Sequence, residues 1–231
     1  MKRYAVIVAG GRGVRLGADK PKQFLEIGGK PILRHTVERF LAFDPSIEII
    51  LVLPKDHREY WRAYCRENGF LERYSMVSGG ITRFHSVQNA LAYVGDTGIV
   101  AVHDGVRPLV SADLLGRLFT AAESCEAVIP AVPVVESVRK VTKDAAGVKA
   151  SAPVDRDGLV LVQTPQVFRA DVLKEAYRQP FRPSFTDDAS VVEAAGHPVS
   201  LVPGERFNIK VTTPGDLSLA ETLLTLFSSA I

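Results

Sequence analysis

Cysteine is scarce in this chain, because Cys65 and Cys125 are the only two among 231 residues and stand far apart. Small secreted folds rely on several disulfides, which two distant cysteines cannot supply. No apolar run approaches the length of about 20 residues that a membrane-spanning helix needs. Residues 1–3 lead directly into a strand-like segment instead of a signal-type stretch. We therefore expect a protein of the cytoplasm with no membrane partner.

An excess of either charge is also lacking. The chain has 28 basic and 26 acidic residues, a net charge of +2, and no run of like charges. Nucleic-acid-binding domains usually carry a basic patch or stripe, so we expect no nucleic-acid partner. Histidine, cysteine and carboxylates do not cluster at spacings typical of zinc ligands, and no nucleophile elbow supports a Ser-His-Asp site.

Apolar residues, at 46% of the chain, are ample for a buried core. Strand-like runs alternate with segments of helical periodicity, and this alternation predicts an α/β fold with a mainly parallel sheet covered by helices on both faces. The expected strands are residues 4–9, 47–53, 74–77, 99–102, 127–131, 160–163 and 199–202, with a strand end at 208–211. We expect residues 164–166 to form a turn, and we expect one domain over 1–231.

The alternation stops after Pro130. Residues 132–135 and 137–141 look extended, a turn-like stretch follows, and residues 148–152 return as another strand. This pattern predicts a β-hairpin arm at 132–153. A two-stranded hairpin is marginally stable alone, so we expect the arm to pack on a partner subunit.

A glycine-rich loop follows the first expected strand. Gly10, Gly11 and Gly13 allow backbone N–H groups to converge on an anion, while Arg15 and Lys22 supply positive charge. One interpretation is a polyphosphate cradle at the carboxyl end of the strand. The other is an ordinary strand-to-helix turn with solvated charges.

Two well-known phosphate-binding motifs do not fit this region. The dinucleotide fingerprint requires a third glycine where Leu16 stands, and Lys30 precedes proline instead of the Ser or Thr of a P-loop. A hydride-transfer enzyme and an ATPase or GTPase are therefore disfavoured. A phosphate site with unusually many cations remains.

Asp104 comes at the end of another expected strand. A carboxylate at this place could hold Mg²⁺ together with phosphate oxygens, or it could cap a turn. His103 is more simply explained as a buried imidazole bonded to backbone. Because ligands of parallel sheets bind beyond the carboxyl ends of the strands, we expect the Gly10 loop, the Gly79 turn and Asp104 to share one rim.

Six segments in order carry a resemblance to a known family. They are AGGRGVRL at 9–16, KPKQFL at 20–25, HDGVRP at 103–108, VDR at 154–156, TPQ at 164–166 and NIKVT at 208–212. Together they resemble the 2-C-methyl-D-erythritol 4-phosphate cytidylyltransferases. The sister family of ribitol-5-phosphate cytidylyltransferases shares most of these segments, and residues 154–158 favour the methylerythritol family.

The resemblance implies a Rossmann-like nucleotidyltransferase fold and a reaction. CMP passes from CTP to 2-C-methyl-D-erythritol 4-phosphate, with Mg²⁺ and release of pyrophosphate, in the non-mevalonate isoprenoid pathway. The resemblance also implies a homodimer clasped by the hairpin arm, which agrees with the interpretation of 132–153. A non-catalytic CTP-binding protein is the alternative outside the enzymes.

Site residues follow from the same resemblance. Arg15 and Lys22 would stabilise the α-phosphorus as catalytic residues, and Asp104 would be the metal ligand. The residues implied for CTP are Ala9, Gly10, Gly11, Gly13, Gly80, Arg83, Ser86, Asp104, Gly105 and Lys210, of which Gly80, Arg83 and Ser86 would read the cytosine. Those implied for the sugar phosphate, some across the dimer, are Arg107, Ser137, Arg156, Thr164 and Thr212.

Overall fold

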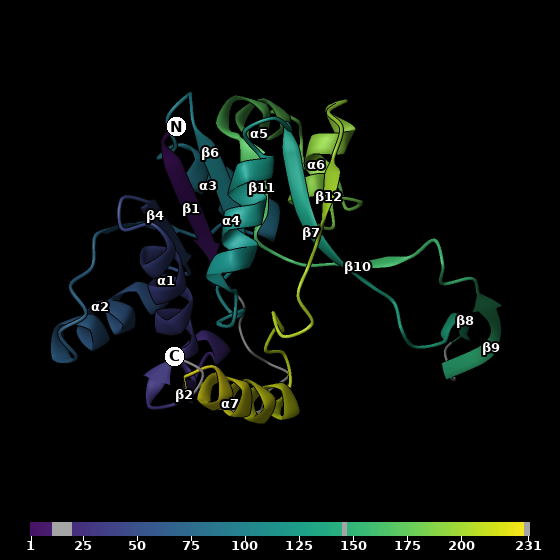
Figure 1. Cartoon of the computed structure of the whole chain (residues 1–231), viewed down its shortest axis with the longest axis horizontal. Helices are drawn as coiled ribbons and strands as arrows, with labels where there is room; N and C mark the ends of the chain where they lie inside the picture. The colour runs from purple at the N-terminus through teal and green to yellow at the C-terminus, as the bar shows by residue number, and fades with distance from the viewer. Residues whose placement is uncertain (11–19, 145–146, 229–231) are drawn as a thin grey trace.

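A mixed eight-stranded sheet forms the centre of the molecule (Figure 1). The structure is a computed structural model that describes residues 1–10, 20–144 and 147–228, with only the backbone described at 227 and 228. The strand order is β10-β7-β11-β6-β1-β4-β5, and β12 pairs with β7. The strands are β1 (Arg3–Val8), β4 (Glu48–Leu53), β5 (Tyr74–Ser78), β6 (Ile99–Asp104), β7 (Ala127–Pro133), β10 (Val160–Val162), β11 (Gln166–Arg169) and β12 (Ser200–Pro203).

Parallel pairing dominates the half of the sheet formed by the first part of the chain. β1 pairs in parallel with β4 and β6, and β4 pairs in parallel with β5. The predicted α/β fold with a mainly parallel sheet is confirmed. In the other half, β11 is antiparallel to both β6 and β7, and β10 is antiparallel to β7.

Two predictions about the second half of the chain are wrong. The expected turn at 164–166 already contains the first residue of β11, an interior strand that the sequence reading missed. Residues 208–211 form no regular strand, although the Val211 N–H donates to the carbonyl of Val106 at 2.9 Å. This segment is held by isolated contacts and not by a continuous ladder.

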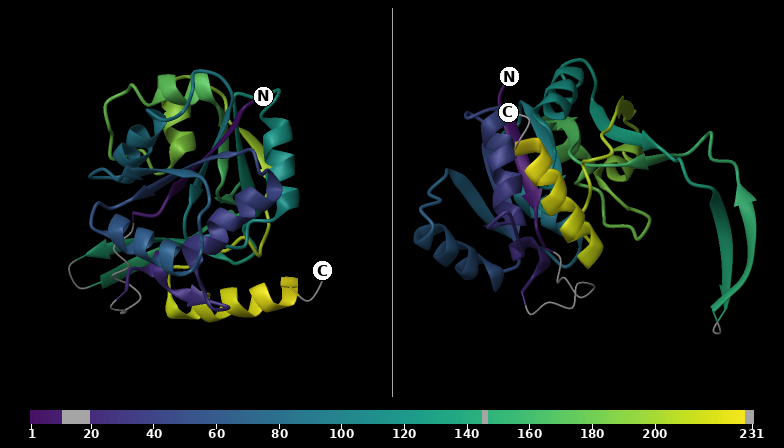
Figure 2. Two further views of the ribbon diagram at one scale, coloured as in Figure 1. Left: turned by 90° about the vertical axis from the view of Figure 1, so that its left-hand side faces the viewer. Right: turned by 60° about the horizontal axis from the view of Figure 1, so that its bottom comes forward.

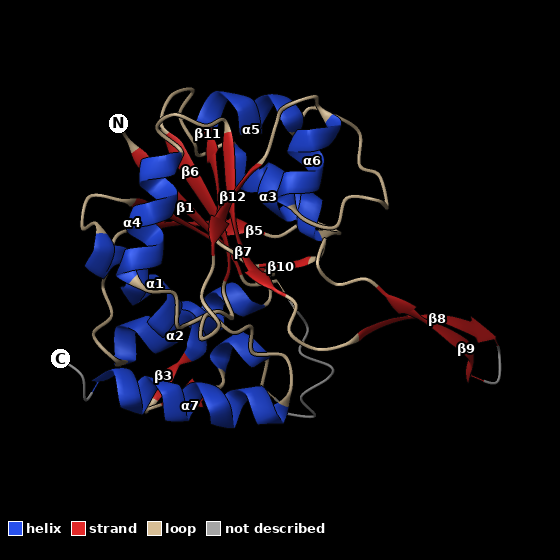
Figure 3. Cartoon of the chain, turned by 45° about the vertical axis from the view of Figure 1, so that its right-hand side comes forward, coloured by secondary structure: helices blue, strands red, loops and turns tan. Residues whose placement is uncertain are grey.

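Helices cover both faces of the sheet, as Figure 3 shows. They are α1 (Ile32–Phe43), α2 (His57–Glu67), α3 (Arg83–Leu91), α4 (Ala112–Ala121), α5 (Ala170–Ala176), α6 (Asp188–Ala194) and α7 (Pro214–Ser228). Helices α1, α2 and α4 pack on one face, and α3, α5 and α6 pack on the other. Thr82 and Ser111 cap α3 and α4, because their side chains accept hydrogen bonds from backbone N–H groups of the first turn.

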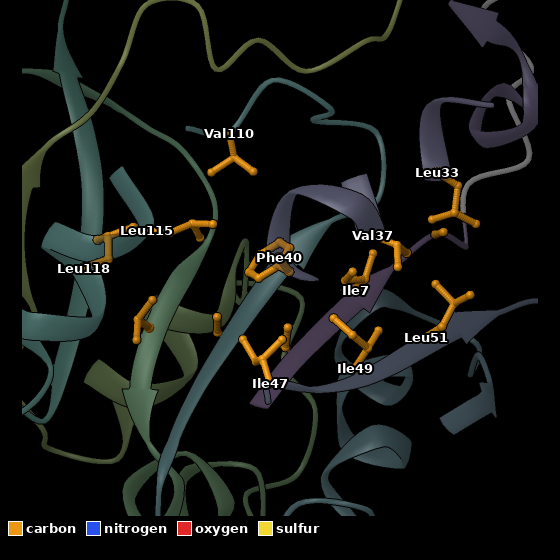
Figure 4. Close-up of a cluster of buried hydrophobic side chains, with 14 of the residues drawn as sticks. Ile7, Leu33, Val37, Phe40, Ile47, Ile49, Leu51, Val110, Leu115 and Leu118 are labelled. Carbon is orange, nitrogen blue, oxygen red and sulfur yellow. The ribbon is translucent and has the colours of Figure 1, made fainter. Parts of the chain in front are cut away.

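Alternate residues of each strand enter opposite cores. Ile7 belongs to the cluster with α1 and α4, which Figure 4 shows around Phe40 and Leu118. Its neighbour Val6 belongs to the cluster with α3, α5 and α6. Since successive side chains of a strand point to opposite faces, burial on both faces explains why these strands are continuously apolar.

Three short elements connect the Gly-rich segment to the body. They are η2 (Lys22–Phe24), β2 (Glu26–Ile27) and β3 (Lys30–Pro31). Phe24 is 1% exposed and stacks against Trp61 of α2, while Ile27 packs in a third cluster with α7. These contacts fix the chain directly after Lys22.

The hairpin arm extends away from the body (Figure 2). It consists of β8 (Val138–Asp144) and β9 (Gly147–Val154), which pair antiparallel in a separate two-stranded sheet. The predicted hairpin is confirmed, but its expected start is wrong, because residues 132 and 133 belong to β7. None of the helices in the described part of the chain has the length and apolar character that a membrane crossing needs.

Leu118→Ala tests the packing of α4 on the sheet. Leu118 is fully buried, and we expect its truncation to lower the free energy of unfolding by about 2–5 kcal/mol. The control is Leu71→Ala, because Leu71 is 79% exposed. Denaturant unfolding of both variants measures the difference. Equal stabilities would show that α4 does not pack as described.

Candidate active site

The carboxyl ends of β1 and β6 meet at one rim of the sheet. Val8 and Asp104 are register partners, and the Gly105 N–H donates to the Val8 carbonyl at 2.9 Å. A Cβ on Gly105 would lie 2.8 Å from the Cβ of Ala9, so only glycine allows this approach. Gly79 is tied to the end of β4 by its N–H, which donates to the Leu53 carbonyl. The Gly79 turn, Asp104 and the end of β1 share one rim, as expected; the loop that follows Gly10 lies outside the described residues.

Asp104 is the centre of a charge cluster at this rim. It is 8% exposed, and three cations surround its carboxylate. Lys210 Nζ lies 2.8 Å from Oδ2, Arg107 Nε lies 3.5 Å from Oδ2, and Arg83 Nε lies 3.8 Å from Oδ1. The sequence places these four residues on three separate segments, and the fold brings them together.

The cations decide the ionisation of Asp104. Burial alone would raise the pKa of this carboxyl group, but attraction by Arg83 and Lys210 and the hydrogen bond from Lys210 hold the pKa well below its usual range. Arg107 shows the opposite balance, since burial lowers the pKa of its guanidinium against the attraction of Asp104. Asp104 is therefore an anion at neutral pH.

His103 holds the Asp104 turn from inside the protein. It is fully buried, with Nε2 3.1 Å from the Arg107 carbonyl and Nδ1 3.2 Å from the Thr164 hydroxyl. A carbonyl can only accept, so Nε2 carries the proton and Nδ1 accepts from Thr164. The Thr164 oxygen in turn accepts from the Asp104 N–H at 3.0 Å. The interpretation of His103 as a buried imidazole bonded to backbone is confirmed.

A cavity of about 370 Å³ opens beside the charge cluster. Arg107 and Lys210 line it on the charged side, and residues at the base of the arm line the other side. Its lining is Arg107, Val132, Pro133, Val135, Leu161, Val162, Gln163, Arg206, Asn208, Ile209 and Lys210. Among the described residues that line it are three cations and no carboxylate, which favours an anionic ligand with an apolar portion.

Two polar atoms beside this cavity lack a hydrogen-bond partner among the described residues. They are Arg107 Nε and Asn208 Oδ1. Arg107 nevertheless donates through Nη1 to the Asn208 carbonyl at 2.7 Å, so the two side chains are fixed relative to each other. Buried polar groups are almost always paired, and this corner of the site is therefore suited to a polar ligand.

The turn after β5 is shaped by Ser86. The Gly80 N–H donates to Ser86 Oγ at 3.0 Å, and that hydroxyl donates to the Thr82 carbonyl at 2.9 Å. A Cβ on Gly80 would lie 2.4 Å from the Cβ of His85, so the backbone would have to move to accept any other residue. Gly80, Arg83 and Ser86 thus form one rigid turn on the rim of Asp104.

Four residues expected to contact the sugar phosphate do not line the cavity. Thr164 supports Asp104 from within the core, and Thr212 Oγ1 donates to Asp216 at the start of α7. Ser137 and Arg156 are exposed at the base of the arm. Arg156 donates to the carbonyl of Val135, which lines the cavity, so it lies next to the site.

The catalytic pair is only partly within the described residues. Gly11, Gly13 and Arg15 lie outside them. Lys22 begins η2, and Gly10 directly follows β1; no atom of the described residues lies within 4 Å of a Cβ built on Gly10.

Sequence reasoning missed two residues of this region. Asn208 lies in the NIKVT segment, whose family resemblance was the signal that could have marked it as a site residue. No role was assigned to its amide from the sequence. Asp188 is fully buried and accepts two bonds from Arg83, at 2.8 and 2.6 Å. No local sequence signal joins Asp188 to Arg83, because 105 positions separate the two residues in the chain.

Comparison with known proteins places this chain in a family. The family model described as 2-C-methyl-D-erythritol 4-phosphate cytidylyltransferase matches residues 4–226. A protein of that name from Bacteroides fragilis is 54% identical over 224 residues, which cover 97% of this chain and 100% of the relative. The chain belongs to the 2-C-methyl-D-erythritol 4-phosphate cytidylyltransferase family.

Solved structures agree with this family. The Francisella tularensis 2-C-methyl-D-erythritol 4-phosphate cytidylyltransferase has a TM-score of 0.79 and 32% identity, over 96% of this chain and 99% of the other. The bifunctional protein from Campylobacter jejuni has a TM-score of 0.77 and 27% identity over 94% of this chain. This chain spans 54% of that bifunctional protein.

The family decides between the alternatives that the sequence left open. This cytidylyltransferase is an enzyme, a nucleotidyltransferase, and not a non-catalytic nucleotide binder. The methylerythritol family is favoured over its ribitol sister, because the matching relatives and the family model carry the methylerythritol name. The Rossmann-like nucleotidyltransferase fold is confirmed by the solved relatives.

His103→Gln tests the hydrogen-bond chain beneath Asp104. Burial lowers the pKa of His103 to about 4 from an ordinary value of 6.5, so the unfolded chain binds this proton more readily than the folded one. The folded state therefore loses stability as the pH falls from 6.5 toward 4. A glutamine can keep both bonds but does not titrate.

We expect the enzyme to lose about 2 kcal/mol more unfolding free energy than His103→Gln between pH 7 and pH 5. Denaturant unfolding at the two pH values measures this difference. His35, whose pKa burial also lowers, is present in both proteins and cancels. Equal losses would show that His103 is not a buried neutral imidazole.

Proposed function

We propose that this enzyme takes the cytidylyl group from CTP and transfers it to the phosphate of 2-C-methyl-D-erythritol 4-phosphate. The products are 4-diphosphocytidyl-2-C-methyl-D-erythritol and pyrophosphate, in the non-mevalonate isoprenoid pathway. The observation that carries the proposal is the buried, ionised Asp104 among Arg83, Arg107 and Lys210, next to a cation-lined cavity. Family membership supplies the substrate class.

The reaction requires two anions to meet. An oxygen of the sugar phosphate attacks the α-phosphorus of CTP, and the bond to pyrophosphate breaks. The nucleophile is already charged at neutral pH, so no strong general base is needed. Catalysis must come from positioning and from fixed positive charge near the α-phosphorus. We assign this role to Arg15 and Lys22, with the backbone of Gly10, Gly11 and Gly13 cradling the triphosphate.

Asp104 is our proposed ligand of Mg²⁺. Oδ2 is held by Lys210 at 2.8 Å, whereas Oδ1 lies 3.8 Å from Arg83 Nε, farther than a hydrogen bond, and is the oxygen that we assign to the metal. The described residues contain no group of three His, Cys, Asp or Glu side chains that could hold a metal ion. One carboxylate fits Mg²⁺ when nucleotide phosphates and waters supply the other ligands. When bound, the ion would offset the negative charge of the triphosphate.

The sugar phosphate is assigned to the cavity beside Asp104. Arg107 and Lys210 would face its phosphate, and Asn208 Oδ1 could accept a hydrogen bond from one of its hydroxyl groups. The cytosine is assigned to the Gly80 turn, where Ser86 fixes the backbone. Thr164 supports the site from the core, and Thr212 fixes the start of α7 that follows Lys210.

We propose that the enzyme is a homodimer. The chain is a single domain, and its arm is the dimerisation element that contacts the partner subunit. An isolated two-stranded hairpin is marginal in water, and β8 and β9 are exposed along nearly their whole length. Exposed apolar side chains continue from the arm onto the body at Val135, Leu161 and Leu201. Ser137 and Arg156 at the arm's base could then contact the substrate of the partner.

A reducing compartment, the cytoplasm, suits this function. Cys65 and Cys125 are free cysteines. Cys65 is buried, and desolvation raises the pKa of its thiol, which keeps it in the unreactive protonated form.

The proposed reaction is tested by release of pyrophosphate from CTP in the presence of Mg²⁺. Parallel reactions contain 2-C-methyl-D-erythritol 4-phosphate or ribitol 5-phosphate at equal concentration. We expect release with the methylerythritol phosphate and little with the ribitol phosphate. A preference for ribitol 5-phosphate, or no release with either acceptor, would refute the proposed function.

Arg15→Ala and Lys22→Ala test the catalytic pair. Each is expected to lower kcat by about 10²–10³-fold, the usual cost of losing one preorganised electrostatic contact. Steady-state pyrophosphate release measures the effect. Lys2→Ala, which removes an exposed lysine paired with Glu48 at the opposite end of β1, is the control. Turnover near that of the unmodified enzyme in either variant would contradict the assignment.

Arg156→Ala tests the role of the arm. Losing one charge-assisted hydrogen bond to phosphate should raise the KM for the sugar phosphate by about 10–100-fold. The dissociation constant of CTP, measured by calorimetry, should stay the same. Loss of CTP affinity would instead show that Arg156 serves the nucleotide.

A further inference from the structure

A second buried carboxylate lies behind the charge cluster. Asp188, the first residue of α6, is fully buried. Its Oδ1 accepts from Arg83 Nη1 at 2.8 Å and from the Tyr177 hydroxyl at 2.5 Å, and its Oδ2 accepts from Arg83 Nη2 at 2.6 Å. Arg83 and Asp188 therefore form a bidentate pair, and the Tyr177 hydroxyl adds a third hydrogen bond to the carboxylate.

The position of Asp188 is fixed from β11. Gln166 is 1% exposed, and its amide nitrogen donates to Asp187 Oδ2 at 2.7 Å. Its amide oxygen accepts from the Ala189 N–H at 2.9 Å. Gln166 therefore binds the residues on both sides of Asp188, and Asp188 cannot shift without breaking these bonds.

The pairing fixes the orientation of Arg83 toward the site. Each terminal nitrogen of the guanidinium donates one hydrogen to Asp188, and Nε lies 3.8 Å from Asp104 Oδ1. Burial opposes the charge of Arg83, but attraction by Asp188 exceeds this cost and raises the pKa of the guanidinium. Arg83 thus remains a cation whose orientation Asp188 decides.

Without the charge of Asp188, Arg83 would have one remaining acidic partner. Asp104 is the other carboxylate in contact with it among the described residues. The free guanidinium would turn its two terminal nitrogens toward Asp104 and compete with Lys210, which holds Oδ2 at 2.8 Å. Asp104 would then be engaged on both oxygens.

We infer that Asp188 is a positioning residue for cytidylyl transfer, acting through Arg83 on the orientation of the Asp104 carboxylate. This inference rests on the proposed function. It also assigns Arg83 to the support of Asp104, because Asp188 holds the guanidinium with Nε 3.8 Å from that carboxylate, and leaves the reading of cytosine to the Gly80 turn and Ser86.

The test compares Asp188→Asn, Arg83→Gln and the double variant in steady-state pyrophosphate release and in CTP binding by calorimetry. We expect Asp188→Asn to lower kcat at least 10-fold while the dissociation constant of CTP changes less than threefold. In the Arg83→Gln background, Asp188→Asn should change kcat less than threefold, since its partner is already missing.

Asp171→Asn is the matched control, because Asp171 accepts two bonds from one arginine as well, from Nε and Nη2 of Arg169, but on the exposed surface. Its kcat should equal that of the unmodified enzyme. A large loss of CTP affinity in Asp188→Asn would overturn the inference, because Arg83 would then read the nucleotide. An equal fall of kcat with and without Arg83 would overturn it too, since Asp188 would then act only on the fold.

Thermal unfolding shows whether Asp188→Asn folds. Should it not fold, Tyr177→Phe removes one bond to Asp188 and keeps the pair. We expect this variant to lower kcat two- to fivefold, with no change in the Arg83→Gln background. An unchanged kcat in Tyr177→Phe with intact Arg83 would then overturn the inference. Activity of the unmodified enzyme is measured first, so failure of the proposed function is seen separately.

Discussion

A buried anion held among cations is the interaction on which the site depends. Asp104 is nearly inaccessible, and a lone carboxylate at that depth would be protonated. Arg83, Arg107 and Lys210 keep it ionised, and Asp188 in turn offsets the charge of Arg83. The result is a network with a small excess of positive charge. Such a network can bind phosphate groups and still present one carboxylate oxygen to a metal.

The site lies at this rim of the sheet for a physical reason. Parallel strands buried on both faces bring the ends of β1 and β6 side by side, where Gly105 lies against Ala9. The antiparallel strand β11 then carries Thr164 just before it and Gln166 at its first position. Thr164 holds the Asp104 backbone, and Gln166 places α6. One short strand therefore supports both buried carboxylates.

The periodicity of apolar residues and the turn residues between them predicted the elements that depend on local signals. The parallel strands and the hairpin arm follow from patterns a few residues long. β11 was missed because it is only four residues long and begins inside the Thr-Pro-Gln segment that predicts a turn. The expected strand at 208–211 was wrong because Val211 makes an isolated backbone bond instead of joining a ladder.

The charged rim was predictable in part. Asp104 could be named from its place at a strand end, and Arg107 and Lys210 from the family resemblance that covers their segments. The pairing of Arg83 with Asp188 could not be predicted, because no local pattern joins two residues on separate helices. Gly11, Gly13 and Arg15 lie outside the described residues, so their predicted roles stay predictions.

The central claim is that the triphosphate of CTP binds against the Asp104 cluster. A crystal structure of the enzyme with CTP and Mg²⁺ tests this claim most directly. We expect the phosphates between Gly10 and Asp104, the metal on Asp104 Oδ1 and the cytosine at the Gly80 turn. A nucleotide bound elsewhere, or phosphates out of reach of Asp104 and its metal, would contradict binding at the Asp104 cluster.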